Sequence, residues 1–313
     1  MELAAGIDFG GTFAKIGLVE RTGRIRSRTQ VAMDPRESFE GIVAPVERTL
    51  RALIEKEGSG ERLVTIGIGT PGFIDKTEGV LIGGCENIPS LQQRSVQEYL
   101  GSAFRVPAFA ENDATSAAAG ELAFGAGRSF SSFVLITVGT AIGGGLVLDG
   151  TVYRGWRGFA GEIGHICVNR DGLWCSCGSR GCLEQYASGT AIVRVYTEKL
   201  RKRGQDPHSS LTTRDVVDRA KTGDPCARDT LEEAGMWIAQ AFGSLLNVLD
   251  LEACILGGGV SEAGEMLLEP IRRHLPDHCW PQVGRGVSVR AAELRNDAGI
   301  LGAAAQAYER LAR

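Results

Sequence analysis

Residues with the chemistry of metal ligands cluster in the middle of the chain. His165 is followed ten residues later by Cys175, and Cys177 and Cys182 come soon after. Three thiolates and one imidazole fill a tetrahedral zinc site and leave no open position for water. The pattern therefore predicts a structural zinc ion and not a catalytic one.

The fourth zinc ligand has a rival in Cys167. Residues 163–168 have the pattern of a strand, in which side chains alternate, so His165 and Cys167 would point to the same face. We expect no secretory signal at the start of the chain, which makes disulfides a weaker interpretation than metal. The other cysteines are scattered and are expected to be small buried apolar residues: Cys85, Cys226, Cys254 and Cys279.

Two carboxylates flank this cluster. Glu162 precedes His165, and Glu184 follows Cys182. A site that only holds the chain together needs no acids at its edges. We therefore expect the zinc to fix functional residues in place.

Glycine-rich turns follow apolar strands at three points of the chain. They are Asp8–Thr12, Thr137–Gly145 and Gly257–Gly259. Glycine lets backbone N–H groups approach an anion closely, which is one way to hold phosphates. The GxxxxGK[ST] spacing of the common strand-loop-helix nucleotide site is absent. Each turn alone is ordinary, but the three together predict a nucleotide site, with a helix start behind Gly259 facing the ligand.

Asp113 lies where a predicted strand runs into a helix, after Glu111 and Asn112. A lone aspartate in that position is more often a helix cap. Phosphoryl transfer to an alcohol, however, needs a carboxylate that accepts the hydroxyl proton. Asn112 carries both a donor and an acceptor, which suits a sugar hydroxyl.

The order of elements repeats. Each half opens with a glycine-turn hairpin and continues with strand-helix alternation, which predicts a duplicated α/β unit with mixed sheets and a cleft between two lobes. Pro45 should kink its helix or mark the true start. We expect strands over 3–8, 15–20, 24–31, 64–69, 106–110, 133–138, 145–149, 253–256 and 287–294, and helices over 38–57, from 113 onward, and over 187–203, 213–221, 227–249, 265–274 and 298–313.

Composition excludes several classes of protein. The chain has 313 residues, enough for two domains, with a net charge of −4 and 43% hydrophobic residues. This charge predicts no general attraction to nucleic acid or to anionic membranes. No apolar run approaches the roughly 20 residues of a membrane helix. We therefore expect a cytoplasmic protein.

The motifs together resemble the ROK family, within the actin-like ATPases and sugar kinases of ribonuclease H-like fold, and most closely its bacterial glucokinase branch. They occur in family order over essentially the whole chain: DFGGT at 8–12, ENDA at 111–114, GT-x-x-GGG at 139–145, E-x-G-H at 162–165, C-x-C-G-x-x-G-C-x-E at 175–184 and LGGGVS at 256–261.

The resemblance implies a two-lobed enzyme, with a small lobe of residues 1–112 plus 298–313 and a large lobe of residues 113–297. Its expected reaction moves the γ-phosphoryl group of ATP, with Mg²⁺, to the 6-hydroxyl of a hexose, most simply glucose. Lobe closure on the sugar and a homo-oligomer, either dimer or tetramer, are also expected.

By position, Asp113 resembles the family's catalytic base. The residues that resemble the family's zinc ligands are His165, Cys175, Cys177 and Cys182. The implied sugar-binding residues are Gly72, Asn112, Asp113, Glu162, His165 and Glu184. The implied ATP-binding residues are Asp8, Gly10, Gly11, Thr12, Lys15, Thr137, Gly139, Thr140, Gly257, Gly258 and Gly259. One departure is Ala141, which replaces a glycine of the second phosphate turn and would be strained by about 1 kcal/mol if that position required a positive φ.

Other functions remain as alternatives. An N-acetylglucosamine, N-acetylmannosamine or other hexose kinase would use the same polar residues, and discrimination at C2 depends on pocket shape. Trp156 and Phe159 could line that region or simply pack on a surface loop. A sugar sensor is the alternative from another class, since the family includes repressors with an added DNA-binding domain. A zinc hydrolase would need an open metal position, which four protein ligands do not leave.

Overall fold

The computed structural model describes residues 1–58, 60–206 and 210–312. The chain forms two compact units. The first holds Met1–Ser129, Gly145–Gly161 and Glu293–Arg313, and the second holds Phe130–Gly144 and Glu162–Ala292. The predicted division into a small lobe of residues 1–112 plus 298–313 and a large lobe of residues 113–297 stays a prediction.

The first unit contains a five-stranded mixed sheet of order β3-β2-β1-β4-β7. The strands β1, β2 and β3 form the predicted antiparallel meander, while β4 and β7 run parallel to β1. Their bounds are β1 Glu2–Phe9, β2 Phe13–Val19, β3 Ile25–Ala32, β4 Arg62–Thr70 and β7 Ala108–Asn112.

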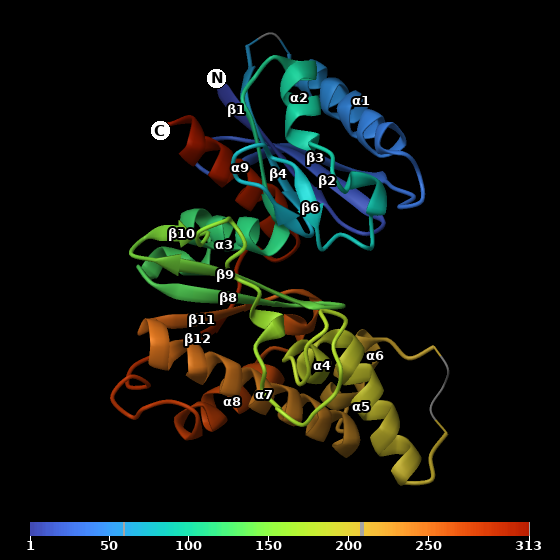
Figure 1. The fold of residues 1–313 in the computed structure, drawn as a ribbon, viewed down its shortest axis with the longest axis vertical. Helices are drawn as coiled ribbons and strands as arrows, with labels where there is room; N and C mark the ends of the chain where they lie inside the picture. Colours follow the sequence, from blue (N-terminus) through green and yellow to red (C-terminus); the bar gives the residue numbers. More distant parts are fainter. Residues whose placement is uncertain (59, 207–209, 313) are drawn as a thin grey trace. The chain divides into compact units, whose positions relative to one another are not determined.

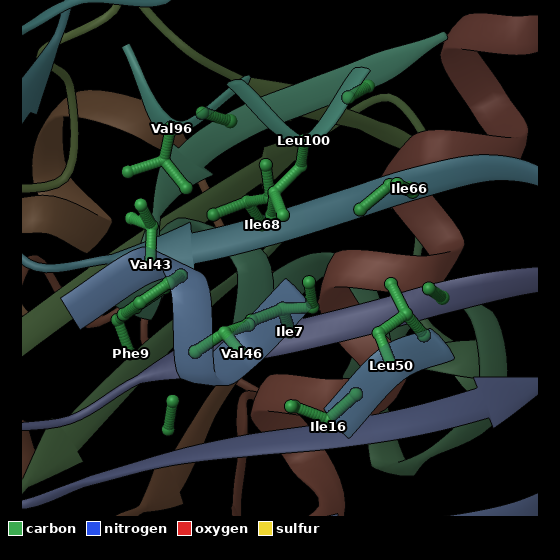
Figure 2. Close-up of a cluster of buried hydrophobic side chains, with 14 of the residues drawn as sticks. Ile7, Phe9, Ile16, Val43, Val46, Leu50, Ile66, Ile68, Val96 and Leu100 are labelled. Carbon is green, nitrogen blue, oxygen red and sulfur yellow. The ribbon is translucent and has the colours of Figure 1, made fainter. Parts of the chain in front are cut away.

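Strand alternation sends β1 side chains to two different layers of helices. Ile7 and Phe9 lie in a core with Val46 and Leu50 of helix α1 (Phe39–Glu57), and helix α2 (Val96–Phe104) packs into the same core (Figure 2). Ala4 faces the opposite layer, which helix α9 (Ala298–Leu311) provides (Figure 1). Period-two alternation thus fixes which helix covers which face.

Helix α9 lies unusually close to the centre of this sheet. A Cβ atom on Gly6 would lie 2.0 Å from the carbonyl oxygen of Ile300, and one on Gly67 would lie 1.8 Å from that of Ala303. Both obstacles are backbone atoms, which cannot rotate away. Glycine at these strand positions is therefore what brings the helix backbone against β1 and β4.

Helix α1 begins where its cap predicts. Ser38 Oγ accepts a hydrogen bond from Gly41 N at 3.1 Å, as expected of an N-cap residue. The suggestion that Pro45 marks the true start is wrong, because the helix runs through it from Phe39.

The second sheet repeats the order of the first, as β10-β9-β8-β11-β12. Its strands β8, β11 and β12 are parallel neighbours, as β1, β4 and β7 are in the first sheet. The boundary between the two units falls within β9. The duplicated α/β design with mixed sheets is confirmed, with bounds of β8 Phe133–Val138, β9 Ile142–Leu148, β10 Thr151–Tyr153, β11 Ala253–Gly257 and β12 Ser288–Ala291.

The four helices predicted for the second unit are present, and their bounds are α5 Gly189–Lys202, α6 Thr213–Lys221, α7 Pro225–Leu249 and α8 Glu265–His274. A short helix that was not predicted, α4 Glu184–Ala187, precedes α5. Short 3₁₀ helices occur at η1 Pro89–Leu91, η2 Ala126–Ser129, η3 Ile163–His165, η4 Gly259–Ala263, η5 Leu275–Asp277 and η6 Arg295–Asp297. The helix start expected behind Gly259 is thus the short η4, which begins at Gly259 itself, and α8 starts only at Glu265.

Several local predictions are wrong. Strand β9 starts at Ile142, so Gly143–Gly145 lie in a strand and not in a turn. Residues 163–168 do not form a strand, because the chain turns through η3 there. The sequence analysis did not predict α2 or the short strands β5 (Phe73–Ile74) and β6 (Leu81–Gly83). The predicted end of the last helix at Arg313 lies outside the described residues.

No helix in the part of the chain that the structure describes combines the length and the apolar character needed to cross a bilayer.

Candidate functional site

The predicted zinc ligands come together within the second unit. One ligand atom from each of His165, Cys175, Cys177 and Cys182 lies within 4.8 Å of all the others. Cys175 Sγ is 3.6 Å from His165 Nδ1, and Cys177 Sγ is 3.6 Å from Cys182 Sγ. Three thiols and one imidazole at these separations fit a closed tetrahedral zinc site.

A tight loop brings the three cysteines together. The Cys175 N–H donates to Ser179 O at 2.9 Å, and the Gly178 N–H donates back to Cys175 O at 3.0 Å. Gly181 N then bonds to Leu173 O at 2.8 Å, which closes the loop just before Cys182. The local C-x-C-G turn therefore presents its sulfurs to one point.

Cys167 is not part of this four-atom cluster, and its side chain is exposed. The prediction that it rivals His165 assumed a strand over 163–168. Because η3 ends at His165, strict alternation between the two residues does not apply. Cys167 instead forms an isolated antiparallel bridge with Cys182.

The thiols of the cluster shift one another's pKa values. Burial would raise the pKa of the Cys175 thiol, but hydrogen bonds from the Cys177 backbone and from the Cys177, Cys182 and His165 side chains lower it to about 7. Burial and the neighbouring thiols raise the pKa of Cys182. A bound divalent cation replaces these protons, because metal ligation deprotonates a thiol outright.

The two glutamates that flank the cluster lie beside it. Glu162 Oε2 is 3.9 Å from His165 Nε2, the ring nitrogen that faces away from Cys175. Glu184 Oε2 accepts a hydrogen bond from Ile142 N at 3.2 Å. Burial, together with the nearby charge of Glu184, raises the pKa of Glu162 although His165 acts against it. His165, Glu162 and Glu184 thus form one polar group next to the metal site.

In the first unit, Gly72, Asn112 and Asp113 lie together. Asn112 Nδ2 donates to Gly72 O at 3.3 Å. Gly72 has φ of 97°, and a Cβ there would lie 2.4 Å from Gly83 O, so only glycine fits this turn.

The cap of helix α3 (Asp113–Phe124) is Asn112 and not Asp113. Asn112 Oδ1 accepts hydrogen bonds from Ala114 N at 3.0 Å and Thr115 N at 3.1 Å. Asp113 is the first helical residue, where the positive end of the helix favours an ionised carboxylate. The capping role weighed for Asp113 is therefore filled by its neighbour.

Asp8 lies against the start of helix α9. A Cβ on Gly299 would be 2.3 Å from Asp8 Cγ. Lys15 Nζ, across the β1–β2 hairpin, is 3.6 Å from Asp8 Oδ2. Burial raises the pKa of Asp8, and Lys15 partly opposes that rise. Gly10, Gly11 and Thr12 form the exposed turn beside it.

The second glycine turn is built without strain. Gly139 N donates to Ala141 O at 2.9 Å. Ala141 does not adopt a positive φ, so the conformational strain considered for alanine at this position does not arise. The turn is held by helix α5, since Gly189 N donates to Gly139 O at 2.7 Å and Thr190 Oγ1 donates to Thr140 O at 2.9 Å.

A pocket of about 340 Å³ opens beside this turn, wholly within the second unit. The starts of α5 and α6 both border it, and the cap of α6 is a full capping box of Thr212 and Asp215. Apart from Thr140, sequence reasoning missed the residues that line this pocket, although the cap pattern of α6 is visible in the sequence. The lining residues are Thr140, Gly189, Thr190, Val193, Leu211, Thr212 and Thr213.

The last glycine run begins at the end of β11, which lies beside the central strand β8. Gly258 has φ of 82°, and a Cβ there would lie 2.4 Å from Val138 O. Glycine at this position thus allows the loop after β11 to cross the end of β8, next to Thr137–Thr140.

Comparison with known proteins agrees with this arrangement. The ROK family model matches residues 4–310. The glucokinase of Thermotoga maritima is 35% identical over 98% of this chain and 97% of its own. The xylose repressor of Bacillus subtilis is 31% identical, over 77% of this chain but 60% of its own.

A solved structure of a ROK family protein is also similar to this chain over nearly its whole length. The ROK family glucokinase from Streptomyces griseus, in complex with glucose and AMPPNP, aligns with a TM-score of 0.83 and 34% identity, over 98% of this chain and 99% of its own. The predicted actin-like ATPase fold is thus confirmed. From its motifs, its duplicated sheets and these relatives, the chain belongs to the ROK family.

Proposed function

We propose that this protein is an ATP-dependent glucokinase that transfers the γ-phosphoryl group to the 6-hydroxyl of glucose. The observation that carries the proposal is Asp113 at the first position of α3, beside Asn112 and Gly72. The full-length similarity to bacterial glucokinases supports the substrate.

Asp113 serves as the general base. Its carboxylate accepts the 6-hydroxyl proton as that oxygen attacks the phosphorus. The oxygen of Asn112 is used by the helix cap, so Asn112 offers the sugar only an N–H donor. Gly72 can approach a second hydroxyl through its backbone.

The polar group of the second unit supplies further sugar contacts. The carboxylates of Glu162 and Glu184 accept hydrogen bonds from hydroxyls, and His165 Nε2 faces the same side as Glu162. His165, Cys175, Cys177 and Cys182 would hold zinc, which when bound supplies no chemistry and fixes the imidazole orientation.

Nucleotide binding is assigned to turns in both units. In the first unit the turn Gly10–Thr12 offers backbone N–H groups, and Asp8 offers a hard oxygen ligand suited to Mg²⁺. Lys15 contributes a positive charge beside Asp8. In the second unit the turn Thr137–Thr140 and the glycines Gly257–Gly259 surround the strand ends, and the adjacent pocket borders two helix starts.

The test is a panel of hexoses with ATP and Mg²⁺. Purified protein should form glucose 6-phosphate, and a coupled dehydrogenase assay with ADP detection should give matching rates. N-acetylglucosamine, N-acetylmannosamine, fructose and xylose are the comparison sugars. Phosphorylation of an N-acetylhexosamine in preference to glucose would select the alternative kinase, and sugar binding with no ADP release would select a sensor.

Assembly and compartment complete the proposal. We infer a homo-oligomer, for which Val248 and Trp280 provide exposed apolar surface, at 79% and 65% exposure, joined through Asn247. Sedimentation velocity decides between dimer and tetramer. The use of ATP and a free hexose favours the cytoplasm.

A further inference from the structure

Cys167 and Cys182 face each other across an isolated antiparallel bridge. Val168 N donates to Gly181 O at 2.8 Å, and Leu183 N donates to Ile166 O at 2.9 Å. These bonds flank the Cys167–Cys182 pair, which exchanges none of its own. The two cysteines are therefore a non-hydrogen-bonded pair, the kind whose side chains approach most closely.

The spacing of such a pair suits a disulfide. Non-hydrogen-bonded partners have Cα atoms about 4.5 Å apart, and disulfides accept Cα separations of about 4.4–6.8 Å. Both side chains leave the same face of the bridge. A disulfide between Cys167 and Cys182 therefore requires rotation of side chains more than movement of the backbone.

The two thiols differ in surroundings. Cys182 is 0% exposed and belongs to the zinc-ligand cluster, whereas Cys167 is exposed and outside it. An exposed thiol meets soluble oxidants first, and a nearby buried thiol can resolve the product. The exposed sulfur of Cys167 thus lies opposite Cys182, one of the candidate zinc ligands.

We propose that Cys167 is an oxidative modification site through which a hydroperoxide removes Cys182 from the zinc ligands. In the first step the Cys167 sulfur attacks one oxygen of hydrogen peroxide. An S–O bond forms, the O–O bond breaks and the other oxygen leaves as water, which gives a sulfenic acid. In the second step the Cys182 sulfur attacks the Cys167 sulfur, the S–S bond forms, and the hydroxyl leaves as water with a proton. Two thiols lose two electrons in total, and the peroxide gains them.

Loss of Cys182 changes the whole zinc site. Its sulfur is one of the four candidate ligands, and Cys177 and Cys182 are in contact at 3.6 Å. Three remaining ligands do not close a structural zinc site. Zinc release is therefore the direct consequence of the disulfide, and thiol reduction with added zinc reverses it.

Tryptic cleavage separates the relevant cysteines. Residues 158–170 contain only Cys167, residues 171–180 contain Cys175 and Cys177, and residues 181–194 contain only Cys182. Zinc-loaded full-length protein is treated with hydrogen peroxide, and released zinc is followed with a chromogenic chelator. Non-reducing digestion and mass spectrometry then identify the joined peptides.

The expected result is a link between peptides 158–170 and 181–194 that appears in step with zinc release. The variant Cys167→Ser should carry the same zinc content before oxidation and release it about tenfold more slowly, since no neighbouring sulfenic acid forms. Cys279→Ser, which removes another partly exposed thiol, should behave as the parent protein.

Any one of the following results would overturn the proposal. They are a link to peptide 171–180 in place of 158–170, equal zinc release from Cys167→Ser, and loss of zinc from Cys167→Ser before any oxidant is added. Protein purified under reducing conditions without zinc would overturn it as well. None of these readouts depends on kinase activity.

Discussion

Glu111 Oε2 accepts a hydrogen bond from Arg154 Nε at 2.5 Å, within the first unit and next to the candidate base. The same oxygen accepts one from Arg310 Nη2 at 3.0 Å. Glu111 is 4% exposed and lies on β7, the edge strand whose last residue is Asn112. One carboxylate thus ties the strand that presents Asp113 to segments some forty and two hundred residues away.

Replacing Glu111 with alanine should destabilise the protein by about 3–5 kcal/mol, because it removes the buried carboxylate that two partly buried guanidinium groups share. Chemical denaturation monitored by circular dichroism measures this loss. Asp34→Ala removes the exposed Asp34–Arg36 pair and serves as the control, with little expected change in the free energy of unfolding. Similar losses in both variants would contradict the role given to Glu111.

Asp113→Asn should lower kcat by about 10²–10⁴-fold, because the amide cannot accept the hydroxyl proton. Glucose binding should change little, since the amide has nearly the same shape. Steady-state kinetics and calorimetric titration measure the two effects separately. Asp218→Asn, an exposed substitution on α6, is the matched control. An Asp113→Asn protein that retains full turnover would show that another group is the base.

Removal of the metal should weaken sugar binding. We expect about one zinc per chain in elemental analysis, with Cys175→Ser losing it. Glucose affinity should fall with the zinc because His165 and the flanking glutamates lose their fixed positions. Cys279→Ser keeps both properties if the assignment is correct. A Cys175→Ser protein with normal zinc content would remove this residue from the ligand set.

The N-cap of α7 predicts a pH-dependent contribution to stability. Asp224 accepts hydrogen bonds from Cys226 N at 2.8 Å, Ala227 N at 3.2 Å and the Tyr196 hydroxyl at 2.6 Å. Burial alone would raise the pKa of Asp224, but these bonds and Arg219 hold it below its usual value. The ionised carboxylate therefore stabilises the folded state above the unfolded pKa of about 3.9, and that contribution is lost as the pH falls through the lower folded pKa.

Asp224→Ala should accordingly cost about 0.5–2 kcal/mol at pH 7. The difference from the parent protein should shrink as the pH falls below about 4. Urea unfolding of both proteins over this range gives the comparison. Asp218→Ala, whose side chain is exposed, should show little difference at any pH. A cost of Asp224→Ala that stays constant down to pH 3 would rule out the charge as its source.

Gly67→Ala should destabilise the first unit by about 1–3 kcal/mol or more, because the new methyl group meets the backbone of α9. The obstacle is the Ala303 carbonyl oxygen at 1.8 Å, which has no rotamer to change. Gly60→Ala is the control, since nothing lies within 4 Å of a Cβ there. Thermal unfolding should show a lower midpoint for Gly67→Ala alone.

Prediction from the sequence succeeded where the signal is local. The apolar runs indicated where most strands lie along the chain, because a short apolar strand and its glycine turn are both contained in a few neighbouring residues. The four residues of the candidate zinc cluster were likewise picked out by residue type and spacing, and the structure brings them together. Prediction failed at 163–168, where alternation favoured a strand but hydrogen bonds to distant residues 181–183 accompany the turn through η3.

The sequence by itself determined the family motifs, the duplicated strand order, and the candidate zinc and catalytic residues. Tertiary structure decided that Asn112 caps α3, that Glu111 joins Arg154 and Arg310, and that Cys167 opposes Cys182. The physical reason is that chain spacing fixes which residues are close within a turn or strand. Contacts between remote segments depend on how strands register and helices pack, and no local pattern records them.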